Sequence, residues 1–182
     1  MIRLFIALEI PEDVKDLVYS RLQESSEYTS GYKWEPKEKI HLTLKFIGDI
    51  QKELLPDIIR EIEFVKDFST FNCNISKFGF FFRKGQPVIL WCNCDAGDKI
   101  NSLVSELNLR LEKFGIEKDT RNFNGHLTLL RIKKRVSENF VTSFKELRFE
   151  PIQFNCNKIA LIESELKPSG SEYKVLKIYE LK

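Results

Sequence analysis

One tetrapeptide, His-Leu-Thr-Leu, occurs twice in this chain, at residues 41–44 and 126–129. A second tetrapeptide, Phe-Asn-Cys-Asn, occurs at residues 71–74 and 154–157, so it follows the first after a similar interval in each half. Self-similarity of this kind indicates an ancestral unit that has been duplicated. We therefore expect residues 1–182 to form a single bilobal domain whose two halves are related by a pseudo-two-fold axis.

Strand-like and helix-like patterns of apolar residues are interspersed along the chain. Alternation predicts strands over residues 3–10, 41–48, 71–82, 88–95, 126–132, 152–162 and 173–181. The helical period predicts one helix that begins at Pro11 and three more over residues 51–66, 98–114 and 138–147. This order, with hairpin-like connections, favours an α+β fold in which two antiparallel sheets, flanked by helices, face a central cleft.

Composition limits the classes of partner. The 182 residues are 42% hydrophobic, and 29 basic residues against 27 acidic ones leave a net charge of +2. The chain therefore has no global field for long nucleic-acid or membrane contacts, and an anionic substrate must be attracted locally. The first residues are apolar, but Glu9 and Pro11 come too early for a secretory or transmembrane segment. We expect a cytoplasmic monomer with no membrane association and no obligate protein partner.

The cysteines are even in number, but no secretion signal accompanies them. We interpret them first as reduced, partly buried thiols: Cys73, Cys92, Cys94 and Cys156. The Cys92-Asn93-Cys94 segment puts two sulfurs on one face of a predicted strand, yet no second cysteine pair or clustered histidine completes a zinc site. A disulfide is the alternative if the source is a hyperthermophile. We expect neither a metal nor a cofactor.

The two histidines of the chain, His41 and His126, both begin the repeated motif. On a strand the first and third residues of H-x-T-x share one face, while the two leucines occupy the other. Each motif taken singly is typical of an ordinary half-buried strand. The duplication instead favours a symmetric set of four functional side chains, completed by Thr43 and Thr128.

This set suits the opening of a cyclic phosphate. Such a reaction needs a base to deprotonate the attacking water and an acid to protonate the departing ribose oxygen. Near neutral pH one histidine can be neutral while the other is protonated. Thr43 and Thr128 would donate hydrogen bonds to the non-bridging phosphate oxygens. A zinc site made of two histidines would need further ligands, and neither motif has an adjacent carboxylate at ligand spacing.

Two cations near the motifs are candidates for phosphate binding. Lys45 lies two residues after Thr43, so ideal alternation points it to the side of His41; a surface lysine is the alternative. Arg131 lies at an odd offset from His126, so it reaches a phosphate there only if the strand bulges or ends.

Other candidates for RNA contact carry weaker signals. The basic run at residues 133–135 could steer RNA, with a solvated loop as the alternative. Phe5, Trp34 and the aromatic run at 80–82 could stack a nucleobase, with core packing as the alternative.

The whole pattern resembles the two-histidine (2H) phosphoesterase superfamily, and within it the RNA 2′,3′-cyclic phosphodiesterases formerly called 2′-5′ RNA ligases. The resemblance spans nearly the whole chain. It rests on the opening Arg3-Leu4-Phe5-Ile6-Ala7, Trp34, the segments 41–48 and 126–131, Trp91, and the ending from Ser164 through Gly170 to Tyr173.

The resemblance implies hydrolysis of RNA ends that bear a 2′,3′-cyclic phosphate to 2′-phosphate ends. It implies that His41 is the proton donor and His126 the proton acceptor, in a bilobal cleft without a metal. Some members also join tRNA halves reversibly through a 2′-5′ bond. Gly125 stands where many members have proline, and a small residue permits the same backbone approach. Residues 87–89 lack an arginine often found before the tryptophan.

Two rival functions remain open at this stage. One is a cyclic phosphodiesterase that acts on small nucleotides, such as ADP-ribose 1″,2″-cyclic phosphate, with the same histidines. The other is a non-catalytic module that binds RNA ends, against which both intact motifs argue.

Overall fold

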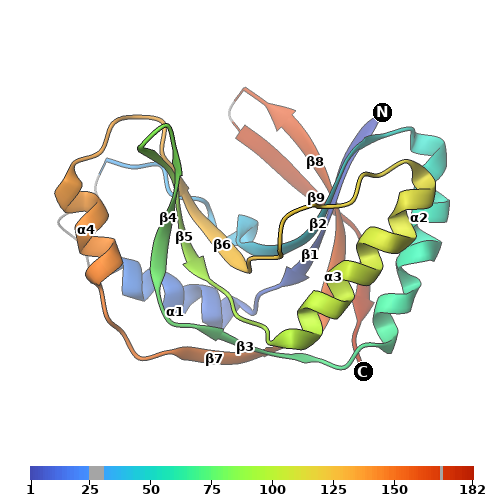
Figure 1. Cartoon of the computed structure of the whole chain (residues 1–182), viewed down its shortest axis with the longest axis horizontal. Helices are drawn as coiled ribbons and strands as arrows, with labels where there is room; N and C mark the ends of the chain where they lie inside the picture. The colour runs from blue at the N-terminus through green and yellow to red at the C-terminus, as the bar shows by residue number, and fades with distance from the viewer. Residues whose placement is uncertain (25–30, 169) are drawn as a thin grey trace.

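Nine strands and four α-helices make up the described part of the chain, residues 1–24, 31–168 and 170–182 of a computed structural model (Figure 1). In chain order they are β1 (Ile2–Glu9), α1 (Glu12–Gln23), β2 (His41–Ile50), α2 (Leu55–Ile62), β3 (Phe71–Ile75), β4 (Phe78–Arg83), β5 (Gln86–Asn93), α3 (Asp98–Leu111), β6 (His126–Arg131), α4 (Glu138–Glu146), β7 (Ile152–Cys156), β8 (Lys158–Lys167) and β9 (Gly170–Glu180). Short 3₁₀ helices occupy Lys37–Lys39, Lys52–Leu54, Glu63–Asp67 and Glu112–Phe114.

The two larger sheets are antiparallel, and each takes strands from both halves of the chain. Their strand orders are β2-β1-β8-β9 and β4-β5-β6. Each half begins with the strand that precedes a helix and a His-Leu-Thr-Leu strand, so the first half starts at β1 and the second at β5. β8 comes from the second half but pairs with β1, whereas β4 comes from the first half but pairs with β5. This exchange means that neither half completes a sheet alone. The expected α+β fold with antiparallel sheets is confirmed.

A third, two-stranded ladder joins the halves. β3 contains the first copy of Phe-Asn-Cys-Asn and β7 contains the first three residues of the second, and the two strands pair in antiparallel register. Phe71 lies opposite Cys156, and Asn72 lies opposite Asn155, whose amide donates to the Asn72 side chain at 3.1 Å. The second repeat of the sequence is therefore a self-complementary connection between the two sheets.

The predictions of one continuous strand over 71–82 and another over 152–162 are wrong, because each range contains two strands. The first divides into β3 and β4 because the Asn93 side chain accepts hydrogen bonds of 2.9 Å from the backbone N–H groups of Ser76 and Lys77. These N–H groups are thereby removed from any ladder. The second strand divides at Asn157, where pairing changes from β3 to β1.

The helix predicted over 51–66 is also more divided than expected. Only α2 is α-helical there, with Pro56 in its first turn and 3₁₀ segments on both sides. Elsewhere the predicted stops hold: Gly115 adopts a left-handed conformation (φ 76°) just after the 3₁₀ extension of α3. The β4–β5 hairpin turns through Lys84 and Gly85, both with positive φ, as a tight hairpin requires.

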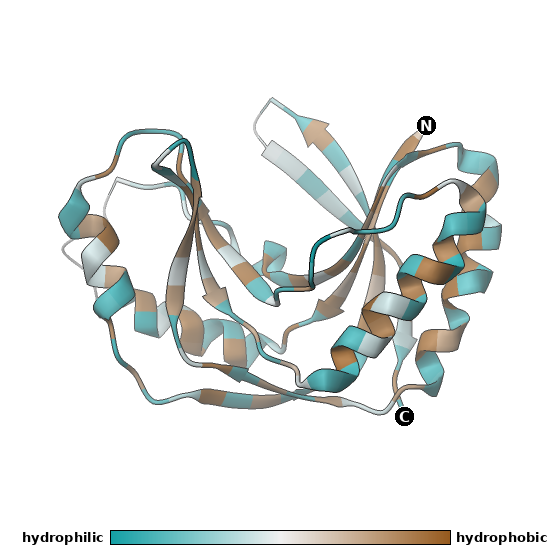
Figure 2. Cartoon of the chain, in the orientation of Figure 1, coloured by the Kyte–Doolittle hydropathy of each residue, from teal (hydrophilic) through white to brown (hydrophobic). Residues whose placement is uncertain are grey.

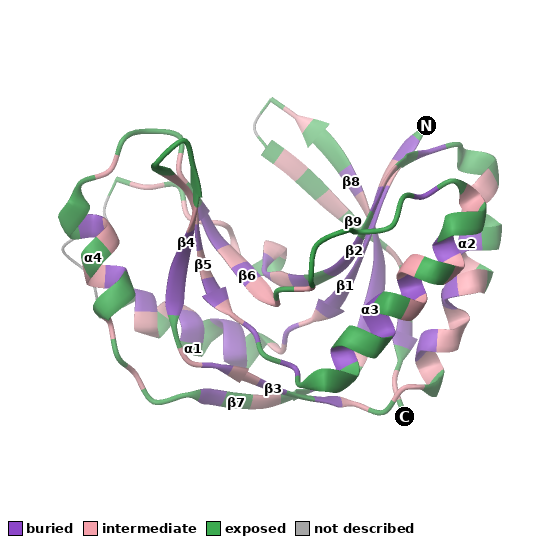
Figure 3. Cartoon of the chain, in the orientation of Figure 1, coloured by how far each residue is buried: buried purple, intermediate pink, exposed green. Residues whose placement is uncertain are grey.

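The helices cover the outer sides of the sheets. In Figure 1, α2 and α3 lie beside the four-stranded sheet and α1 and α4 lie around the three-stranded one. Each helix has hydrophobic residues, brown in Figure 2, that are buried, purple in Figure 3. Among the described residues, no helix is long and apolar enough to cross a bilayer.

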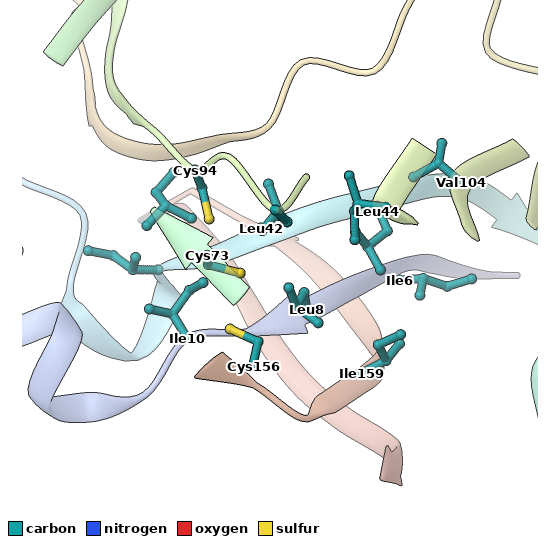
Figure 4. Close-up of a cluster of buried hydrophobic side chains, with 14 of the residues drawn as sticks. Ile6, Leu8, Ile10, Leu42, Leu44, Cys73, Cys94, Val104, Cys156 and Ile159 are labelled. Atoms are coloured by element: carbon teal, nitrogen blue, oxygen red, sulfur yellow. The ribbon is translucent and has the colours of Figure 1, made fainter. Parts of the chain in front are cut away.

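All four cysteines are free and buried, as the sequence predicted. Figure 4 shows Cys73, Cys94 and Cys156 among aliphatic side chains where β3, β7 and the segment after β5 meet. The Cys156 thiol donates to the Glu9 carbonyl at 3.2 Å. These thiols act as small core residues in the described structure.

The backbone before β6 passes very close to the end of β5. The Cys94 N–H donates to the Gly125 carbonyl at 2.9 Å, and a Cβ at residue 125 would lie 2.1 Å from the Cys94 carbonyl oxygen. A backbone atom cannot rotate out of the way, so only glycine fits this contact. The absence of proline at this position therefore has a local steric reason.

We expect Gly125→Ala to destabilise the protein by about 1–3 kcal/mol, because the added methyl group forces two backbone segments apart. The free energy of unfolding in urea measures this. Asn124→Ala is the matched control, since its side chain is exposed; it should change stability by less than about 0.5 kcal/mol. Equal stability of the two variants would contradict the close contact.

Candidate active site

A cleft of about 400 Å³ lies between the two larger sheets. It contains both histidines and both motif threonines. Its lining is Arg3, Phe5, Glu35, Lys39, His41, Thr43, Phe46, His126, Thr128, Arg131, Ser164, Leu166, Ser171 and Tyr173.

The two motifs reach this cleft by the same local means. In β2, Leu42 and Leu44 are buried in the core, and this leaves His41 and Thr43 on the cleft side. In β6 the leucines of the second motif are equally buried. The alternation expected from the sequence thus places one imidazole and one hydroxyl from each sheet in a common space.

Both strands bulge at the fourth residue of the motif. In β2, Thr43 and Lys45 pair with adjacent residues of β1, so Leu44 has no partner. In β6, Thr128 and Leu130 likewise pair with adjacent residues of β5. The extra residue reverses the alternation from that point onward.

The bulge makes the prediction for the Lys45 side chain wrong. Lys45 is only 2% exposed and does not line the cleft. Its ammonium group donates to the Glu117 carbonyl at 2.6 Å and to the Asp119 carboxylate at 2.9 Å. Lys45 therefore ties β2 to the segment that leads into β6. Phe46, one residue later, takes the place in the cleft.

The corresponding bulge in β6 returns Arg131 to the side of His126. The sequence predicted that Arg131 could reach this side only if the strand bulged or ended, and the bulge does place it in the lining of the cleft. Its Nε donates to a Glu35 carboxylate oxygen at 2.9 Å.

Phe46 and Arg131 occupy equivalent positions in the two strands, so this position is apolar in one motif and cationic in the other. Arg3 and Lys39 also line the cleft, and the Arg3 guanidinium lies 5.1 Å from the centre of the Phe46 ring.

His41 lies in an aromatic environment. Its ring centroid is 4.8 Å from that of Phe5 and 5.5 Å from that of Tyr173. Burial among these rings disfavours the charged imidazolium and lowers the pKa of His41 to about 4, from an ordinary value of 6.5. In the free protein His41 is therefore neutral at pH 7.

Charges and backbone act on His41 as well. The positive charges of Lys15, Arg131 and His126 lower its pKa further, whereas a hydrogen bond with the Lys39 backbone opposes the shift. A bound anion in the cleft would supply the opposite charge and raise the pKa of His41 again.

His126 is oriented by the backbone just before it. Its Nδ1 lies 2.8 Å from the Asn124 carbonyl oxygen, and the Phe81 ring meets the imidazole edge-on at 4.8 Å. Since a carbonyl can only accept a hydrogen bond, Nδ1 carries the proton. The other nitrogen, Nε2, is then the one that can accept or donate a proton for a ligand.

Sequence reasoning did not assign several of the cleft residues. Tyr173 and Arg3 belong to segments that the family resemblance includes, and that was the available signal. Glu35 and Lys39 come from the irregular segment before β2, where no periodic pattern exists to predict a side-chain direction. Lys39 donates to the Ser171 carbonyl at 2.6 Å and so joins this segment to β9.

Comparison with known proteins also finds the duplication. The LigT-like phosphoesterase family model matches residues 8–91 and again residues 90–173. A Thermotoga maritima protein named RNA 2′,3′-cyclic phosphodiesterase is 28% identical over 175 residues, which are 96% of this chain and 92% of the relative. A protein of the same name from Archaeoglobus fulgidus is 28% identical, covering 98% of this chain and 99% of the relative.

Solved structures share the fold. A protein of Thermus thermophilus superposes with a TM-score of 0.78 at 26% identity, covering 98% of this chain and 97% of that one. The apo form of LigT from E. coli gives a TM-score of 0.77 at 19% identity, covering 100% of this chain and 98% of that one.

The burial of His41 predicts a titration. We expect nuclear magnetic resonance to give a pKa of about 4 for His41, and Phe5→Ser to move it toward 6.5 because water then reaches the ring. Phe81→Ser is the matched control, since Phe81 contacts the ring of His126 instead. A wild-type His41 that titrates near 6.5 would show that the aromatic burial is absent in solution.

Proposed function

The chain belongs to the LigT-like phosphoesterase family, and we propose that it hydrolyses RNA ends bearing a 2′,3′-cyclic phosphate. Water attacks phosphorus, the P–O3′ bond breaks, and a 2′-phosphate with a free 3′-hydroxyl is left. The observation that carries this proposal is the meeting of two histidines from equivalent strands of different sheets in one cleft. The names of the relatives from Thermotoga maritima and Archaeoglobus fulgidus support the choice of substrate.

In this proposal the two histidines divide the proton transfers. His126 accepts the proton of the attacking water, and His41 donates a proton to O3′ as it leaves. The assignment of each role comes from the family resemblance. The Asn124 carbonyl supports the role of His126, because it holds the proton on Nδ1 and leaves Nε2 for water.

Protonation of His41 depends on the substrate. Its pKa of about 4 keeps it neutral in the free protein. The negative charge of the cyclic phosphate favours imidazolium once the substrate is bound, so the acid forms where it is used. This coupling would also limit protonation of the cleft in the absence of substrate.

The remaining polar groups would bind the phosphate. Thr43 and Thr128 offer hydroxyl donors from the two sheets, and Arg131 supplies a cation. These groups would stabilise the negative charge that develops on the non-bridging oxygens in the transition state. Lys45 takes no part in this proposal because its ammonium group is bound elsewhere.

The same groups would also permit ligation. If the 5′-hydroxyl of a second RNA replaces water, its attack with departure of O3′ forms a 2′-5′ bond. His126 would accept the proton of the 5′-hydroxyl and His41 would protonate O3′, as in hydrolysis, so no further residue is needed for ligation. The two histidines would exchange roles only when the 2′-5′ bond is cleaved again.

We expect the purified, chelator-treated protein to convert an RNA ending in 2′,3′-cyclic phosphate to a 2′-phosphate. His41→Ala and His126→Ala should each reduce kcat/KM by at least about 100-fold, because each removes one proton transfer. Chromatography that separates 2′- from 3′-phosphate ends measures the product.

Thr142→Ala on the exposed surface of α4 is the control and should keep wild-type activity. Circular dichroism checks that both histidine variants fold. A 3′-phosphate product, or full activity in either histidine variant, would refute the proposed function.

The assignment of the acid can be tested separately with an analogue in which sulfur replaces O3′. A thiolate leaves without protonation more readily than an alkoxide, since an ordinary thiol has a pKa of about 8.5. We expect His41→Ala to hydrolyse this analogue at close to the wild-type rate, while His126→Ala remains inactive. The opposite result would exchange the two roles.

A further inference from the structure

A second cavity of about 420 Å³ adjoins the catalytic cleft. The two share Glu35, Lys39, Arg131, Ser171 and Tyr173, so they form one continuous space. We call this second cavity the flanking groove. Its other lining residues are Gly31, Tyr32, Lys33, Trp34, Pro36, Leu130, Ile132, Lys133, Lys134 and Gly170.

Charge in the flanking groove is strongly one-sided. Its lining includes five cationic side chains: Lys33, Lys39, Arg131, Lys133 and Lys134. Among the described residues that line it, the one carboxylate is Glu35, which already pairs with Arg131. Since the whole chain has a net charge of only +2, this concentration of positive charge is a local feature.

Two aromatic side chains form a rigid wall of the same groove. Tyr32 packs on Phe140 with ring centroids 4.8 Å apart, and Trp34 packs on Phe144 at 6.1 Å. Both partners are buried residues of α4. Aromatic rings beside a row of cations are the arrangement that binds single-stranded nucleic acid, through base stacking and backbone charge.

We propose that the flanking groove binds the nucleotides that precede the cyclic phosphate, so that the site is built for RNA strands. This inference rests on the proposed function. A cyclic phosphate closes the 3′ end of a strand, so the rest of the RNA must leave the cleft from its 5′ side. The flanking groove is continuous with the cleft and offers a path of suitable charge and size.

A third cavity adjoins the flanking groove. Lys133 and Lys134 also line this third cavity, which adds Arg135. We expect an RNA strand of several nucleotides to follow this extension of the groove. The basic run at 133–135 thus lies along the proposed path.

The test compares kcat/KM for cytidine 2′,3′-cyclic phosphate with that for a hexanucleotide ending in the same cyclic nucleotide. We expect the hexanucleotide to be preferred at least tenfold at low salt. The double variant Lys133→Glu/Lys134→Glu should reduce this preference to near one. The slope of log kcat/KM for the hexanucleotide against log salt concentration should become less steep in this variant, by about 0.7 for each RNA phosphate that it no longer neutralises.

The matched control is Lys52→Glu/Lys177→Glu, which makes the same change in charge outside these three cavities. It should keep the preference. Equal kcat/KM for the two substrates in the wild type, an unchanged preference in the groove variant, or a higher kcat/KM for ADP-ribose 1″,2″-cyclic phosphate would each overturn the inference.

Binding is measured in parallel to separate this inference from the proposed function. Fluorescence anisotropy of a labelled hexanucleotide with a 2′-phosphate end reports the groove without any chemistry. Absence of all hydrolysis would refute the proposed function. Weaker hexanucleotide binding in the groove variant alone would still support the groove, and equal binding in both variants would overturn it.

Discussion

The exchange of β4 and β8 between the two halves is the constraint on which the cleft depends. A two-histidine site needs two side chains from different sheets at a fixed separation. Here each sheet is completed by a strand from the other half, and the β3–β7 ladder connects them again. The chain crossings and the β3–β7 ladder limit relative movement of the sheets, so the pairing that holds the fold also positions both imidazoles.

Within that frame, the two bulges make nearly identical strands chemically different. Each strand presents histidine, then threonine, then a third side chain on the cleft side: Phe46 in β2 and Arg131 in β6. The duplicated backbone supplies the symmetric part of the site. One asymmetric feature comes from a single position in each copy, which holds an apolar ring in β2 and a cation in β6. A substrate with one phosphate and one ribose is itself asymmetric, and such a cleft can orient it.

The sequence predicted the element types, the hairpin and the inward leucines, because these follow from period and turn chemistry. It could not predict that β3 and β4 separate, since this depends on Asn93, a residue distant in the chain that captures two backbone N–H groups. Four of the six side chains proposed for the site have an even offset within their motif and lie in the cleft as alternation requires. Lys45 and Arg131 both lie beyond a bulge, and a bulge has no reliable signature in a single sequence. The bulges therefore turn Lys45 away from the cleft and turn Arg131 toward it.

The surroundings of the two histidines also show why a symmetric motif need not give symmetric chemistry. His41 is enclosed by Phe5 and Tyr173, which come from β1 and β9. β9 extends only the four-stranded sheet, because the other sheet ends at β4. An extra strand on one side thus buries one histidine in aromatic rings and leaves its counterpart with a single edge contact from Phe81. Burial lowers the pKa of His41 in the free protein, so under the proposed function its protonation is linked to the binding of a phosphate. The division of roles in the pair can therefore arise from the strand that the duplication does not repeat.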